Sequence, residues 1–158
     1  MNLLLWATAV DESHDAILEQ IKRIGYDGVE LPIFEHDAAA FERVGEKLDE
    51  LGLERTAVTV STEDANPISP DASIRAEAVV RLKLAVDMCR LSGVEKLCGP
   101  LHSALGVFSG GMPTGEEWEN GKATMREVAD YAGEHGVTLG MEFLTRFELY
   151  FLTCAVDW

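Results

Sequence analysis

The sequence is poor in cysteine, in basic side chains and in long apolar runs, and each shortage excludes a class of protein. Only three of the 158 residues are cysteines, Cys89, Cys98 and Cys154, and no two of them form a CxxC pair. A disulfide framework or a thiolate zinc site is therefore not expected, and a reducing cytoplasm is the predicted location. No apolar run approaches the roughly 18 residues that a membrane span requires, and the run Leu3–Trp6 lacks the basic flank of a signal peptide.

Basic residues are scarce relative to acidic ones. Lysine and arginine number 13 against 28 aspartates and glutamates, which gives a formal net charge of −15. Such a charge repels nucleic acids and anionic membranes, so neither is expected as a partner, and solubility is the simplest explanation of the excess. With 47% hydrophobic residues and the length of one ordinary domain, the chain is expected to form a single domain with a sizeable core.

Short apolar runs alternate with longer amphipathic ones along the chain. Strands are predicted over residues 2–8, 28–31, 56–61, 96–99 and 137–143. Helices are predicted between them, over residues 11–24, 37–51, 69–91 and 114–135. Ser69 with Pro70 is a typical start for the third helix, and Thr114 with Glu117 predicts a capping box for the fourth. Strands that alternate with helices indicate parallel βαβ units with right-handed crossovers.

Two folds are built from such units, the doubly wound sheet and the eight-stranded barrel. The turn over residues 8–11 has no glycine, so a dinucleotide fingerprint and a P-loop are excluded, but a flavodoxin-like sheet is not. The predicted strands alternate large apolar side chains with small or polar ones, whereas a doubly wound sheet is apolar on both faces. We expect the large set to face the helices: Val29, Leu31, Val58, Val60, Val137, Leu139 and Met141. The other set would line a barrel: Gly28, Glu30, Ala57, Thr59, Ser61, Thr138, Gly140 and Glu142.

Glu142 is the strongest candidate for chemistry. A carboxylate at the inner carboxyl end of a strand needs a metal, an arginine or a substrate hydroxyl as its partner, and Arg146 could supply an ion pair instead. Glu30 is expected at a similar strand end, with a structural role as the favoured interpretation. His102 lies in a predicted loop on the same side, where it could meet a sugar or a carboxylate. Trp6 could stack on a sugar face or belong to the core.

Three runs of sequence resemble one known family. Residues 24–30, IGYDGVE, resemble the second strand of the xylose-isomerase-like barrel superfamily. Residues 69–75, SPDASIR, are similar to a helix start in its ketose 3-epimerase branch, the tagatose and psicose 3-epimerases. Residues 142–148, EFLTRFE, resemble that branch's E-x-x-N-R-F-E motif, with Thr145 in place of the asparagine. The resemblance identifies residues 1–158 as the N-terminal part of a single (β/α)8 barrel, an α/β fold with about five of eight strands present.

The resemblance implies metal-dependent epimerisation of a ketose at C3 through a cis-enediolate. Glu142 would be both a catalytic residue and a ligand of a divalent metal, manganese first, with cobalt or magnesium as alternatives. Glu148 would bind the terminal hydroxyls of the sugar substrate, and Trp6 would lie beside the sugar. The predicted sugar-binding set is completed by Glu30, His102 and Arg146.

The family takes its other metal ligands, an aspartate, a histidine and a second glutamate, from later strands, and a full barrel takes about 250 residues. These 158 residues alone are therefore expected to be inactive, and their open sheet edges are expected to promote association, for example into a homo-oligomer. The alternatives are a hydroxypyruvate isomerase or an inosose dehydratase of the same superfamily, or a non-catalytic flavodoxin-like binding module. The strongly negative net charge argues against an apurinic endonuclease, because such an enzyme must bind DNA.

Overall fold

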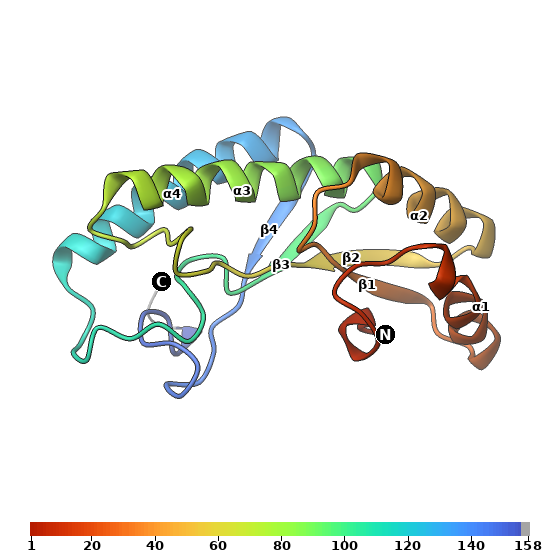
Figure 1. Cartoon of the computed structure of the whole chain (residues 1–158), viewed down its shortest axis with the longest axis horizontal. Coiled ribbons are helices and arrows are strands. Elements are labelled where there is room, and N and C mark those ends of the chain that lie inside the picture. Colours follow the sequence, from red (N-terminus) through yellow and green to blue (C-terminus); the bar gives the residue numbers. More distant parts are fainter. Residues whose placement is uncertain (156–158) are drawn as a thin grey trace.

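The computed structural model describes residues 1–155 as a parallel sheet covered by helices (Figure 1). The strands are β1 (Gly28–Pro32), β2 (Glu54–Val58), β3 (Lys96–Gly99) and β4 (Thr138–Met141). The helices are α1 (Asp15–Ile24), α2 (Ala38–Leu51), α3 (Ala72–Leu91) and α4 (Gly115–Glu134), preceded by two 3-10 turns, η1 (Leu3–Leu5) and η2 (Glu12–His14). The strand order is β1-β2-β3-β4, and each neighbouring pair is parallel.

The helices pack on one face of this sheet. In Figure 1 they follow one another along the upper and right-hand sides, in the order of the chain. Their apolar side chains form one core with those of the strands, as Leu18 of α1, Leu48 of α2 and Val128 of α4 do with Leu97 of β3. A doubly wound sheet would carry helices on both faces and reverse its strand order. The flavodoxin-like alternative therefore does not fit the structure.

The alternation predicted for β1 and β4 is confirmed. Val29 and Leu31 of β1 are buried in the core beneath the helices, and Leu139 and Met141 of β4 pack against the same core. In β2 the prediction was wrong, because Ala57 is fully buried in that core while Val58 lines the opposite face. The small side chain of Ala57 therefore lies under the helices, and the larger valine faces the open side.

The first expected strand, residues 2–8, is not formed. Asn2 makes a single parallel bridge to Glu30, and the chain then turns into η1. The Asn2 side chain accepts a hydrogen bond from the Leu4 amide at 2.8 Å and so caps this turn. This one bridge to β1 does not hold the segment extended against a local cap. The sheet therefore has four strands where five were expected.

Two other predictions concern helix starts. The capping box at α4 is confirmed, because the Thr114 hydroxyl accepts from the Glu117 amide at 3.2 Å and Glu117 accepts from the Thr114 amide at 2.7 Å. The start of α3 was placed too early. Asp71, not Ser69, is its N-cap, and accepts from the Ser73 amide at 2.7 Å.

Candidate functional site

A cavity of about 670 Å³ lies on the helix-free face of the sheet and reaches the carboxyl ends of β3 and β4. Three carboxylates line it: Glu30, Glu142 and Glu148. The rest of its wall is largely apolar and includes Val58, Val60, Cys98, Pro100, Leu105, Phe143 and Leu144. Acidic groups on an apolar, concave wall are typical of a small-molecule site. The sequence predicted the carboxylates, whereas Val58, Val60 and Leu105 were missed because their orientation depends on how the strands and the loops after them pack together.

Glu142 follows β4 directly and is held by the end of β3. Its amide donates to the carbonyl oxygen of Gly99 at 3.0 Å, and its own carbonyl oxygen contacts Nε2 of His102 at 3.0 Å. Its side chain is exposed and lines the cavity. The ion pair with Arg146, which the sequence left open as an alternative, is not among the salt bridges of residues 1–155. The structure therefore gives no support to that alternative.

Glu148 lies on the same wall as Glu142. Its Oε2 accepts from the Thr145 hydroxyl at 2.8 Å and from the Thr145 amide at 3.3 Å. Its carbonyl oxygen accepts from the Gly106 amide at 2.8 Å, which joins the segment after β4 to the loop after β3. These two segments lie together at the lower left of Figure 1. Thr145, the departure from the family motif, therefore orients the Glu148 carboxylate.

His102 is placed behind Glu142, not in the cavity. Its side chain is buried, with the residue 1% exposed, and its Nδ1 lies 3.0 Å from the Ser103 hydroxyl. Burial lowers the pKa of His102, and the hydrogen bond to the Glu142 carbonyl acts in the opposite direction. This placement corrects the prediction that His102 contacts a sugar. The His102 ring points into the protein, where it contacts the carbonyl oxygen of Glu142, 40 residues later in the chain.

Glu30 is in the middle of β1, and not at its carboxyl end as expected. Asn2 Nδ2 donates to Glu30 Oε2 at 2.6 Å, which supports the structural interpretation of this carboxylate. In the sheet register Glu30 pairs with Thr56, and Lys96 of the next strand pairs with Thr138. Glu30 therefore lies about four residues below Glu142, roughly 13 Å along the strands at about 3.3 Å per residue.

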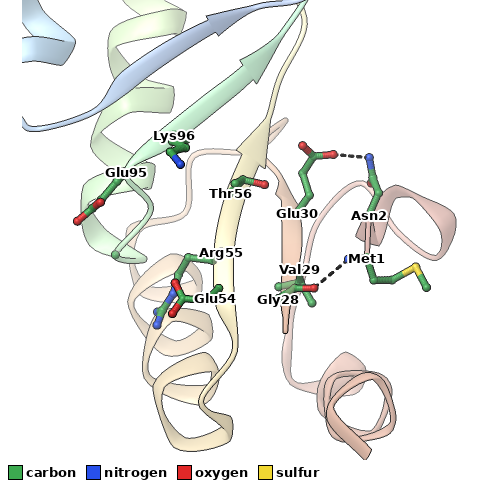
Figure 2. A pocket seen from close by; sticks show the side chains of 11 residues that line it. Met1, Asn2, Gly28, Val29, Glu30, Glu54, Arg55, Thr56, Glu95 and Lys96 are labelled. Carbon is green, nitrogen blue, oxygen red and sulfur yellow. Dashed lines mark hydrogen bonds between the residues drawn. The ribbon is translucent and has the colours of Figure 1, made fainter. Parts of the chain in front are cut away.

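Figure 2 shows a second cavity, of about 550 Å³, at the amino ends of the strands. Glu30 lines it as well as the first cavity, and the Met1 amino group donates to the Gly28 carbonyl at 2.8 Å on its rim. Four of the remaining lining residues are charged: Glu54, Arg55, Glu95 and Lys96. In parallel barrels the amino ends serve stability and the carboxyl ends carry the chemistry. The candidate site is therefore the cavity with Glu142.

Two predicted sugar contacts lie away from both cavities. Trp6 ends η1 and is 47% exposed, and it lines neither cavity. Arg146 lies on an exposed turn after Phe143 and also lines neither. The position of Trp6 follows from the 3-10 turn that replaces the expected first strand. The structure does not bring either side chain to Glu142.

Cys98 lies on the open face of the sheet, between Glu30 and Glu142 along the strand direction. Burial raises the pKa of its thiol, and the charges of Glu30 and then Glu142 raise it further. A raised pKa keeps the thiol protonated and a poor nucleophile. Cys98 therefore forms part of the cavity wall, and its raised pKa disfavours the reactive thiolate form.

The donor set for a divalent metal is not complete among the described residues. No group of three or more histidine, cysteine, aspartate or glutamate side chains within residues 1–155 is close enough to hold an ion. Protein metal sites for hard divalent ions take several oxygen or imidazole donors. Glu142 by itself does not constitute such a site.

The sequence model of the xylose isomerase-like TIM barrel family matches residues 18–157. The chain belongs to this family. Parallel strands in sequential order, with helices on one face, are what such a barrel requires.

Within this family the chain is similar to ketose 3-epimerases. It is 27% identical over 135 residues to the L-ribulose 3-epimerase of Methylomonas sp. (strain DH-1), a match that covers 85% of this chain and 47% of the relative. It is 24% identical over 144 residues to the D-psicose 3-epimerase of Agrobacterium fabrum, covering 89% and 50%. The crystal structure of D-allulose 3-epimerase from Methylomonas sp. in complex with D-allulose matches with a TM-score of 0.87 and 26% identity, over 99% of this chain and 54% of that one.

The chain thus spans about half the length of the curated relatives it matches. The part that it does span superposes closely on a solved epimerase, and the sheet, helices and carboxyl-end loops all lie within that part. Among residues 1–155, no helix combines the length and apolar character needed to cross a membrane.

Proposed function

We propose that these residues supply one wall of the sugar site of a ketose 3-epimerase, with Glu142 as the carboxylate that moves a proton at C3. The observation that carries the proposal is the position of Glu142 at the carboxyl end of β4, in a cavity that it shares with Glu148. The similarity to epimerases of L-ribulose and D-psicose supports a ketose as the substrate.

The chemistry requires a base at a carbon beside a carbonyl. Glu142 would remove the C3 proton to give a cis-enediolate, and return of a proton to the opposite face would invert the centre. Glu148, whose Oε2 is oriented by Thr145, would accept hydrogen bonds from the hydroxyls at the far end of the sugar. The apolar wall would exclude water from the enediolate.

A single carboxylate on one face cannot invert a centre, because a proton returned by the same group restores the substrate. Glu148 follows Glu142 on the same wall, and Glu30 lies about four residues lower, roughly 13 Å along the strands. The proton donor for the opposite face, and the remaining donors for manganese or another divalent ion, are therefore assigned to the part of the family's barrel that this chain does not span. The 158 residues alone are expected to be inactive.

The experiment is a chimera that joins residues 1–158 to the part of the Methylomonas L-ribulose 3-epimerase that the match leaves uncovered. Interconversion of D-allulose with D-fructose, and of L-ribulose with L-xylulose, is followed by chromatography with manganese present. E142Q should lower turnover by about 10²–10⁴-fold and abolish deuterium incorporation at C3, as expected for loss of a general base. E95Q, which alters a glutamate of the amino-end cavity, is the matched control and should retain activity.

Three results would contradict the proposal. Full activity of the E142Q chimera would exclude Glu142 as the base. Turnover of hydroxypyruvate or of an inosose, with none of either ketose, would favour the alternative enzymes of the superfamily. Epimerisation by the purified 158-residue chain would show that the expectation of inactivity is wrong.

A further inference from the structure

We infer that His102 is a positioning residue that fixes the main chain of Glu142 and thereby aims its carboxylate into the cavity. The inference rests on the proposed function for the role of Glu142, but the contact itself does not. It is made by a side chain from the loop after β3 with a peptide group at the end of β4, 40 residues later in the chain.

The two main-chain groups of Glu142 are both held by the same short segment. The amide donates to Gly99 at 3.0 Å, and the carbonyl oxygen lies 3.0 Å from His102 Nε2. With both groups bonded, rotation about the Glu142 backbone would break at least one hydrogen bond. The exposed carboxylate of Glu142 therefore extends from a main chain that two hydrogen bonds hold in place, although β4 itself ends one residue earlier.

The protonation pattern of the His102 ring follows from its partners. A carbonyl oxygen can only accept, so Nε2 must carry the proton that bonds to Glu142. In the neutral ring Nδ1 is then an acceptor, and the Ser103 hydroxyl at 3.0 Å is its donor. Ser103 is itself buried, so this arrangement is sheltered from water. The hydroxyl thus selects the tautomer that can hold Glu142.

The remaining surroundings of the ring are mostly apolar, although Lys122 also lines the cavity beside it. His102 lies 5.9 Å from the ring of Phe151 and borders a cavity of about 290 Å³ that is also lined by Trp118 and Met125. An apolar side chain of similar size would therefore be accommodated on this side. A core-filling role and a positioning role of His102 can therefore be distinguished by substitution. If His102 fills the core, an apolar ring should replace it best, whereas if it positions Glu142, a side chain with an N–H donor should replace it best.

The test measures amide hydrogen exchange by NMR in the 158-residue chain and in its H102F and H102Q variants. Phenylalanine preserves the ring but removes the donor, and glutamine removes the ring but retains an N–H donor at a similar reach. If His102 positions Glu142, exchange of the Glu142 amide should accelerate on the order of tenfold in H102F. It should stay within about twofold of the original rate in H102Q. The Ile33 amide, which donates to Val58 at the other side of the sheet, is the internal control.

A core-filling role predicts the reverse order, with H102F unchanged and H102Q accelerated, and that result would overturn the inference. A long-range ¹⁵N spectrum of the original chain gives a second test that needs no variant. It should show the Nε2–H tautomer, and an Nδ1–H tautomer would overturn the inference even if both variants fail to fold. A fully active E142Q chimera together with the predicted exchange pattern would refute the proposed role of Glu142 and leave the positioning contact established.

Discussion

Substitution of Gly99 by alanine should strongly destabilise the sheet next to the candidate site. Gly99 ends β3 with φ of +130°, a conformation that side chains rarely adopt. A Cβ atom added there would lie 2.1 Å from the carbonyl oxygen of Thr59. Since that oxygen belongs to the backbone, the two chain segments would have to move apart.

The magnitude follows from two contributions. A non-glycine residue in a sparsely populated backbone region costs on the order of 1–3 kcal/mol. Overpacking against a rigid neighbour costs typically another 1–3 kcal/mol. G99A should therefore lower the free energy of unfolding by roughly 4 kcal/mol, a large share of the 5–15 kcal/mol of an ordinary domain. Because Gly99 also accepts from the Glu142 amide, the same change would displace the anchor of Glu142.

Urea unfolding followed by circular dichroism measures this loss. At a slope of about 2 kcal/mol per molar urea, G99A should lower the midpoint by about 2 M. G136A is the matched control, because Gly136 also has a positive φ of 72° but a Cβ there meets nothing within 4 Å. That variant should lose only about 1 kcal/mol, or about 0.5 M.

The difference between the two variants contains the cost of the backbone approach at Thr59, which only G99A incurs. Midpoints for G99A and G136A that agree within their error would refute this reasoning, because strain at φ alone would then account for both. A loss of slope without a loss of midpoint would instead indicate a change in the unfolded state.

Three further predictions concern groups away from the sheet edge. The Arg81 guanidinium, with a smaller effect of Thr62, lowers the pKa of Asp64 to about 2, so R81Q should return it toward 3.8 in a carboxyl ¹³C titration. Because the pKa of Asp64 is lower in the folded state than in the unfolded state, the contact with Arg81 stabilises the fold above about pH 4, and this stabilisation is lost as the pH falls toward 2. An unchanged Asp64 titration in R81Q would contradict the assignment. Burial raises the pKa of Cys89 to about 12, so Ellman's reagent at about pH 8 should modify this thiol only after unfolding, as peptide mass spectrometry would show. T114A removes the acceptor for the Glu117 amide and should cost about 1 kcal/mol in urea unfolding, and an unchanged midpoint would exclude the cap as a stabilising contact.

Features that depend on local sequence could be predicted, and those that depend on neighbouring elements could not. The span of β3 and the capping box at Thr114 match the expectation, because apolar alternation and side-chain caps are short-range signals. The first strand failed because the Asn2 cap competes with pairing at an edge. The orientation of β2 failed because the size of Val58 suggested burial under the helices, whereas the register turns it toward the cavity.

The candidate site divides in the same way. Glu142 and Glu148 could be placed together from a single motif six residues apart, and the structure brings both to one cavity. The position of Glu30 in mid-strand depends on its register with Thr56 and could not be read from the chain. The place of His102 behind Glu142 arises from a contact across 40 residues, which no local pattern contains.

The sequential order of the strands has a consequence for how the protein is made. The strands and helices that contact one another most in the described chain are successive ones: β1 with β2, β2 with β3, β3 with β4, α2 with α3 and α3 with α4. Each βα unit therefore closes only a short loop of chain when it docks on the one before it, and the entropy lost at each step is small. A ribosome releases such a chain in the order in which its units pack. The fold can accordingly grow during synthesis one unit at a time, with each completed unit serving as the template for the next.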